Sequence, residues 1–147
     1  MNQQQRMEDL VGRYVEAFNQ QDVDALGRVL AQNFIDHTPL LSGLPSGREG
    51  ARSFAKQLMA AFPDLWGSIE DTVTESDAVV ARIRWTGTQQ GRFSDLPASG
   101  RTVSITAIHM MKACEGEIVE HWAGVDQHEV RRQLGTSVDN PAVAPHA

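Results

Sequence analysis

In the N-terminal part of the chain, apolar side chains recur mainly with the period of an α-helix. The spacing over about residues 3–20 predicts one amphipathic helix with a broad apolar stripe. Asp22 fits the N-cap of a short second helix. A third helix is expected to begin near Arg48 and to stop at Pro63, because proline cannot continue a helix. A brief extended piece, residues 34–39, and a turn-rich loop separate the second helix from the third.

From Leu65 onward the apolar positions recur with a period of two, which is typical of β-strands. Glu115 and Gly116 predict a hairpin turn between the last two strands, and a short closing helix is expected after Asp126. The predicted strands are residues 66–75, 78–88, 101–112 and 116–126.

Three helices followed by an antiparallel meander predict an α+β domain rather than alternating β-α-β units. A curved antiparallel sheet cannot bury one face alone, and the apolar stripes of the helices suit that face. We therefore expect residues 1–135 to form a cone-shaped barrel with a pocket between the three helices and the sheet. The tail, residues 136–147, has no periodicity and is expected to be disordered. The residues expected in the core or lining the pocket are Leu10, Tyr14, Phe18, Leu58, Phe62, Ile105 and Val119.

The length of 147 residues fits one domain with a substantial core. The net charge of -6 argues against nucleic acid or an anionic membrane as the main partner. The single cysteine, Cys114, excludes an intramolecular disulfide framework and a multi-cysteine zinc site. No apolar run has the length of a membrane span, and the first residues lack the apolar segment of a signal peptide. A cytoplasmic protein is therefore expected.

Two histidines, His109 and His121, lie on strand faces that are otherwise apolar, and one hairpin joins their strands. Counting outward from the turn brings them within a residue or two of being opposite, where Cβ atoms lie about 4.5–5.5 Å apart. Such a pair could share a proton, act as acid and base, or hold a polar ligand. The alternative is that each is a buried histidine bonded to a backbone carbonyl, to Thr106 or to Tyr14.

Three other polar residues are weaker candidates. Asp126 could orient a histidine or act as a general base, but with Glu129 it also fits a capping box of the last helix. His37 either closes the mouth of the pocket or lies on the surface. Glu120 shares a strand face with Trp122 and is expected on the outer side of the sheet. No spacing of ligand residues indicates a metal site, and the chain has no glycine-rich phosphate loop.

Several stretches together resemble the SnoaL-like polyketide cyclase, or ester cyclase, family of the nuclear transport factor 2-like superfamily. No one stretch is specific, but their order and spacing over roughly residues 6–135 are fairly so. The stretches are Val15–Asn19, Ala61–Leu65, Gly87–Thr88, Gly91–Phe93, Pro97–Arg101, His109, Gly116–Trp122, Asp126 and Gln133–Gly135.

The resemblance implies a cone-shaped α+β barrel that is usually dimeric or larger. It also implies an intramolecular aldol reaction that closes a ring on a polyketide ester without metal or organic cofactor. In the characterised cyclases an aspartate at the end of the last strand acts as acid/base, and a histidine on the preceding strand assists. The histidine maps onto His109, whereas the aspartate position here is Ala123, which cannot move a proton.

Three functions remain open from the sequence. The first is a cofactor-independent acid/base enzyme acting on an apolar oxygenated small molecule, with His109, His121 and Asp126 as catalytic residues. The second is a non-catalytic small-molecule binding protein of the same fold, because Ala123 replaces the family's aspartate. The third is an assembly domain whose sheet face dimerises. We expect a homodimer formed through the outer sheet face, because dimerisation would bury Trp122 and Ile118, which share that strand face. The residues expected to bind the substrate are Tyr14, Phe18, His37, Phe62 and Ala123.

Overall fold

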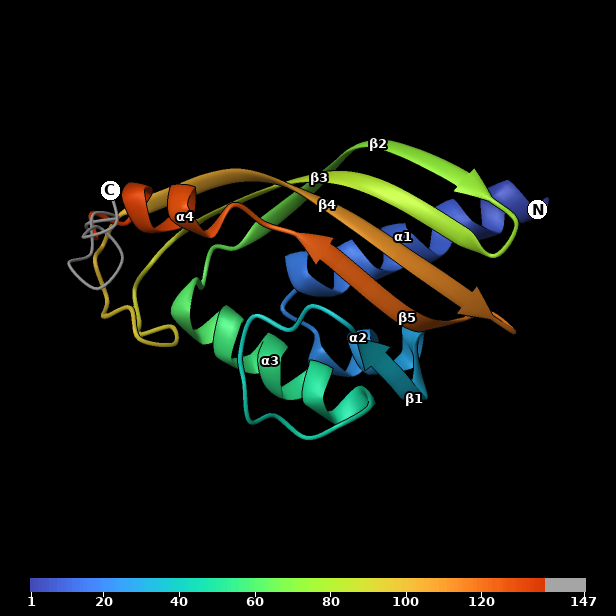
Figure 1. Ribbon diagram of the computed structural model, residues 1–147, viewed down its shortest axis with the longest axis horizontal. Coiled ribbons are helices and arrows are strands. Elements are labelled where there is room, and N and C mark those ends of the chain that lie inside the picture. The colour runs from blue at the N-terminus through green and yellow to red at the C-terminus, as the bar shows by residue number, and fades with distance from the viewer. Residues whose placement is uncertain (137–147) are drawn as a thin grey trace, which may run out of the picture.

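The protein is described by a computed structural model covering residues 1–136, and it has the predicted α+β architecture (Figure 1). The helices and strands follow the predicted order, with one additional strand near the N-terminal helices. They are α1 (Gln3–Asn19), α2 (Val23–Val29), β1 (Leu30–Asp36), α3 (Arg48–Ala61), β2 (Trp66–Glu75), β3 (Ala78–Thr88), β4 (Thr102–Cys114), β5 (Glu117–Gly124) and α4 (Gln127–Gln133).

The helices begin where the sequence supplies capping side chains. Asn2 and Gln5 form a capping box at the start of α1, in which each side chain bonds to the other residue's backbone N–H. The Asp22 carboxylate accepts a hydrogen bond of 2.9 Å from the backbone N–H of Ala25 and so caps α2. These caps satisfy N–H groups that have no partner inside the helix.

The sheet is mixed rather than wholly antiparallel. Its strand order is β1-β5-β4-β3-β2, and β1 pairs in parallel with β5 while the other neighbours are antiparallel. The extended piece predicted at residues 34–39 overlaps the end of β1 only at residues 34–36. Strand β1 does not alternate between buried and exposed residues, because its pairing with β5 is irregular between Leu30 and Ile35. A period-two pattern could therefore not reveal it.

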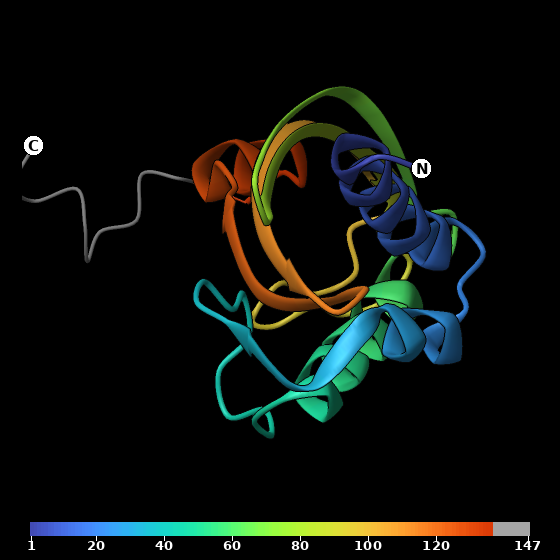
Figure 2. The same cartoon turned by 90° about the vertical axis from the view of Figure 1, so that its right-hand side faces the viewer.

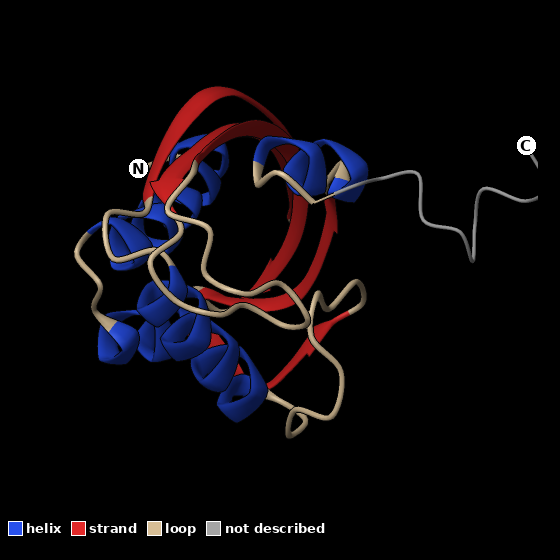
Figure 3. Ribbon diagram, turned by 90° about the vertical axis from the view of Figure 1, so that its left-hand side faces the viewer, coloured by secondary structure: helices blue, strands red, loops and turns tan. Residues whose placement is uncertain are grey.

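The sheet curls around the N-terminal helices, so that its strands form an arc when seen end-on (Figures 2 and 3). Helices α1, α2 and α3 lie on the concave side, and the buried side chains of α1 and of the inner sheet face form one core. Such burial is the main favourable contribution to folding. The expected cone of helices and sheet is confirmed.

One predicted core residue is wrong by one position. Val119 is only half-buried, whereas its neighbour Ile118 is 1% exposed and belongs to the core. The cause is an irregularity in β5: Ala113 pairs with Ile118 but Lys112 pairs with Glu120, so Val119 is an extra residue. A bulge of this kind reverses the inward and outward alternation on one side of it.

The hairpin between β4 and β5 turns at Glu115 and Gly116, which both have positive φ angles, 51° and 80°. The second of these positions suits glycine because it has no Cβ to collide with the backbone. Of the tail predicted at residues 136–147, all but Thr136 lies outside the described residues.

The homodimer stays a prediction, and the structure contradicts one of the observations on which it was based. It assumed that Ile118 lies on the outer face beside Trp122, but Ile118 is buried. Within residues 1–136, no helix has both the length and the apolar character needed to cross a membrane.

Candidate active site

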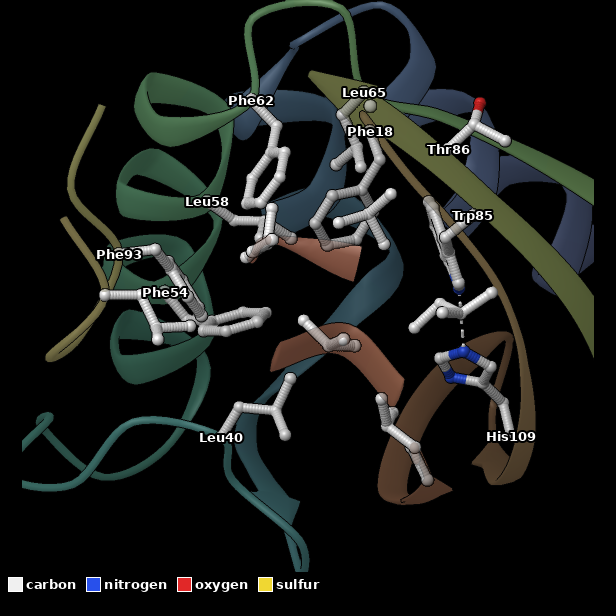
Figure 4. A pocket seen from close by; sticks show the side chains of 18 of the residues that line it. Phe18, Leu40, Phe54, Leu58, Phe62, Leu65, Trp85, Thr86, Phe93 and His109 are labelled. Atoms are coloured by element: carbon white, nitrogen blue, oxygen red, sulfur yellow. Dashed lines mark hydrogen bonds between the residues drawn. The ribbon is translucent and has the colours of Figure 1, made fainter. Parts of the chain in front are cut away.

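The concave side of the sheet encloses a cavity of about 150 Å³ that is almost entirely apolar. Figure 4 shows Trp85 and His109 on one side of it, facing Phe54, Leu58, Phe62 and Phe93 on the other. Predicted ligand contacts Tyr14, Phe18, Phe62 and Ala123 all line this cavity. Its remaining lining residues include Leu40, Leu65, Thr86, Leu96, Val103, Ile105, Val125, Val130 and Leu134.

The lining of the cavity carries no charged side chain among the described residues, and its polar side chains are those of Tyr14, Trp85, Thr86 and His109. An engineered apolar cavity of similar volume in another protein holds one benzene molecule. The present volume therefore accommodates about one ring. Leu40, in the loop between β1 and α3, lines the cavity and is 40% exposed, so a ligand larger than one ring would extend past this loop.

A chain of hydrogen bonds leads from the cavity through both predicted histidines. The indole N–H of Trp85 donates to His109 Nε2 at 3.1 Å, which is the dashed line in Figure 4. His109 Nδ1 lies 2.9 Å from His121 Nε2, and His121 Nδ1 lies 3.2 Å from Asp36 Oδ1. His109 and His121 are each 6% exposed. The two imidazoles meet as the strand faces predicted, with His109 paired to Ala123 and His121 to Met111 in the sheet register, but only His109 lines the cavity.

The two ends of this chain determine where its protons lie. An indole nitrogen can only donate, so His109 Nε2 must be the acceptor and the proton of neutral His109 is on Nδ1. That proton is donated to His121 Nε2, and His121 in turn donates its Nδ1 proton to the Asp36 carboxylate. In this arrangement every ring nitrogen of Trp85, His109 and His121 has a hydrogen-bond partner, and both imidazoles are neutral.

The electrostatic surroundings of His109 agree with a neutral ring. Burial among apolar groups, together with the nearby His121, lowers the pKa of His109 to about 3, although Asp36 acts in the opposite direction. The pKa of Asp36 is also lowered: burial alone would raise it, but hydrogen bonds from His121 and Thr38 and the attraction of His121 outweigh burial. Asp36 is therefore an ionised carboxylate at neutral pH.

Trp85 is held in place by its neighbours on two elements. Its ring makes an edge contact with Phe18 at a centroid distance of 5.5 Å. On the adjacent strand Gly67 pairs with Trp85, and a Cβ at Gly67 would lie 2.6 Å from Cζ3 of the indole. The side chain of Asn19 bonds to both the N–H and the carbonyl of Gly67. The missing Cβ thus leaves the space that the indole fills.

Tyr14 lies beside both histidines and also lines the cavity. Its ring centroid lies 5.8 Å from that of His121 and 6.3 Å from that of His109. Burial, and to a lesser extent Asp36, raises the pKa of the Tyr14 hydroxyl, so it stays protonated. Within residues 1–136 this hydroxyl makes no hydrogen bond.

Two important residues were missing from the sequence-based site. Trp85 alternates in the sequence with Val79, Ala81 and Ile83 on one strand face, but nothing in the pattern showed that its N–H meets His109. Asp36 was passed over because β1 was not recognised as a strand beside β5. In the structure it is paired directly with His121 across the parallel strands, and it also accepts from the backbone N–H of Thr38 at 3.1 Å.

Two predicted site residues lie elsewhere. The Asp126 carboxylate caps α4 by accepting from the Glu129 N–H at 3.0 Å, which is the alternative role the sequence left open. His37 does not line the cavity: its ring stacks on Trp122 at 4.3 Å and bonds to Glu120 at 2.9 Å. Residues of one strand alternate between faces, so Asp36 points toward His121 whereas His37 points away. Within residues 1–136, no three metal-ligand side chains converge.

The sequence and the fold have counterparts in known proteins. The sequence model of the family described as SnoaL-like polyketide cyclase matches residues 8–134. The chain belongs to the SnoaL-like polyketide cyclase family.

Two relatives in this family are aklanonic acid methyl ester cyclases. DauD of Streptomyces sp. strain C5 and DnrD of Streptomyces peucetius are each 28% identical over 140 residues, which are 90% of this chain and 84% and 93% of theirs. The structure of TsrD from Streptomyces laurentii superposes with a TM-score of 0.85 at 28% identity, covering 93% of this chain and 99% of that one. The SnoaL-like fold thus extends over nearly the whole chain.

The resemblance assigned the family's aspartate to position 123, and Ala123 does line the cavity. Its backbone N–H donates to the Thr38 hydroxyl at 2.7 Å, so β5 is tied to the chain just beyond β1 at this point. At the position where a SnoaL-like cyclase is expected to carry its acid/base, this chain has a methyl group. The ionisable groups of the site are instead His109, His121 and Asp36, which hydrogen bonds connect in that order.

Proposed function

We propose that the protein is a cofactor-independent acid/base enzyme that forms an enolate on an apolar, oxygenated molecule of the polyketide type and closes a ring. One observation carries the proposal: His109 stands at the polar end of an apolar cavity with its far nitrogen bonded to a second buried imidazole. A lone structural histidine would need no titratable partner. Two buried imidazoles in contact can accept and return one proton by passing it from His109 to His121, which does not line the cavity.

In this proposal His109 exchanges a proton with the substrate and Tyr14 donates to the oxygen on which negative charge develops. A donor aimed at a developing oxyanion is worth the most where water is excluded. The uncharged lining favours an ester or ketone over a free acid, since a buried carboxylate without a partner is costly. Walls of Phe54, Leu58 and Phe93 suit a flat, unsaturated ring system.

The test uses aklanonic acid methyl ester, the compound in the names of the two relatives, together with simpler aromatic β-ketoesters. Aldol ring closure gives a product of the same mass, which chromatography separates, and enolate formation alone exchanges the α-proton for deuterium in heavy water. We expect His109→Ala to lower kcat by about 10²–10⁴-fold. His128→Ala is the matched control, because His128 is an exposed imidazole on α4.

The second candidate is a binding protein that retains the cavity without its chemistry. Ala123 favours it, as does the Trp85 N–H that already occupies the free nitrogen of His109. Under this alternative the ketoesters bind saturably, no α-proton exchanges, and His109→Ala only weakens binding. Ring closure by Ala123→Asp and not by the natural protein would decide for the binding protein.

A further inference from the structure

Resting on the proposed function, we infer that Asp36 supplies the carboxylate that position 123 lacks, and that it acts on the substrate through His121 and His109. It is a positioning residue, because two imidazoles separate it from the cavity. The supporting geometry is a direct strand pair between Asp36 and His121 and an unbroken run of hydrogen bonds of 3.2 and 2.9 Å to His109. The carboxylate thus comes from β1 rather than from the last strand.

The proton transfers balance without any other reactant. The substrate displaces the Trp85 N–H from His109 Nε2, and this nitrogen then takes the α-proton while the C–H electron pair becomes the enolate. The Nδ1 proton of His109 passes to His121 Nε2, and the ionised carboxylate of Asp36, 3.2 Å from His121 Nδ1, stabilises the imidazolium that forms. When the new C–C bond converts the substrate carbonyl into an alkoxide, the same protons move back and His109 protonates that oxygen.

The two ends of the hydrogen-bonded path from His109 to Asp36 lie in surroundings of different polarity. His109 faces the apolar cavity, while the Asp36 side chain is 33% exposed and borders a second cavity of about 310 Å³ beneath the loop between β1 and α3. The polar and charged groups that face Asp36 are His121 from β5, Tyr14 from α1 and the Thr38 N–H. After the forward transfer the positive charge rests on His121, which contacts the Asp36 carboxylate and does not line the apolar cavity. The apolar cavity then contains the enolate and no imidazolium.

The same two strands carry a natural control. On their other face Glu120 bonds to His37 at 2.9 Å, one residue away from the Asp36–His121 pair on each strand. Both pairs join a carboxylate to an imidazole, and both carboxylates are one-third exposed. Only the Asp36 pair connects to the cavity. Comparing the two substitutions therefore separates the effect of the relay from the loss of one negative charge at this edge of the sheet.

Kinetics on the ketoesters test the inference directly. Asp36→Asn keeps the shape and one acceptor oxygen but removes the negative charge that stabilises protonated His121, so we expect kcat to fall about 10²-fold or more with KM changed less than about threefold. Glu120→Gln should behave as the natural protein. Asp36→Glu, which retains the charge on a longer side chain, should keep more of kcat than Asp36→Asn. A kcat unchanged in Asp36→Asn, an equal loss in Glu120→Gln, or a loss confined to KM overturns the inference.

Proton NMR gives a readout that needs no turnover. A hydrogen bond to a carboxylate is shorter and stronger than one to an amide, so the His121 Nδ1–H resonance should move upfield in Asp36→Asn and stay in place in Glu120→Gln. If no ketoester reacts with the natural protein, the proposed function fails while this shift still supports the relay geometry. A resonance unaffected by Asp36→Asn overturns that geometry whether or not the protein is an enzyme.

Discussion

The depressed pKa of His109 predicts a specific loss of stability in mild acid. A histidine that titrates near 6.5 when unfolded but at about 3 when folded takes up its proton only by unfolding over the intervening range. The unfolded state then binds more protons than the native state, so the free energy of unfolding falls as pH falls. This contribution is fully present above about pH 6.5 and is lost progressively as the pH drops toward 3.

The magnitude follows from the size of the shift. Each pH unit below about 6.5 removes about 1.4 kcal/mol, so His109 alone should cost the folded protein about 2 kcal/mol between pH 7.5 and pH 5. Asp36 does not interfere in this window, because its own lowered pKa confines its titration to more acidic solution. The groups facing His109 are Trp85 from β3, Tyr14 from α1, His121 from β5 and, beyond it, Asp36 from β1.

Urea unfolding at pH 7.5, 6 and 5 measures this contribution, with equal m-values required for each comparison. In His109→Gln the decrease between pH 7.5 and pH 5 should shrink by about 2 kcal/mol, whatever the variant's absolute stability. His128→Gln removes an exposed imidazole instead and should leave the decrease unchanged. If His109→Gln and the natural protein lose the same stability over this range, His109 does not reside as a neutral buried ring and the proton assignment along the chain is wrong.

Three further substitutions test other parts of the structure. Gly67→Ala should push the indole of Trp85 away from His109, cost about 1–3 kcal/mol and change the tryptophan fluorescence, because the new Cβ would lie 2.6 Å from the ring. Ile118→Ala should cost about 2–5 kcal/mol in chemical unfolding and Val119→Ala distinctly less, and the reverse order would contradict the bulge in β5. Asp126→Ala should cost about 0.5–2 kcal/mol as a lost cap while kcat stays unchanged, so a large fall in kcat at constant stability would restore Asp126 as a catalytic residue.

Local patterns in the sequence determined most of the architecture. Side chains at helical or alternating spacing identified three helices and four strands, since each of these elements buries one face. The same patterns predicted that His109 and His121 point into the interior of the domain, because both lie on strand faces that are otherwise apolar. The capping box read from Asp126 and Glu129 was a local signal too, and it correctly offered the structural role that Asp126 has.

Only the tertiary structure revealed Trp85 and Asp36, the residues at the two ends of the hydrogen-bond chain. Trp85 meets His109 across β3 and β4, where the glycine at position 67 leaves room for the indole. Asp36 meets His121 only because β1, 85 residues earlier in the chain, pairs in parallel with β5. Parallel pairing joins segments that are distant in sequence, and no local pattern encodes which strand becomes the neighbour. The sequence could therefore identify the two imidazoles, whereas only the folded chain assigns their protons.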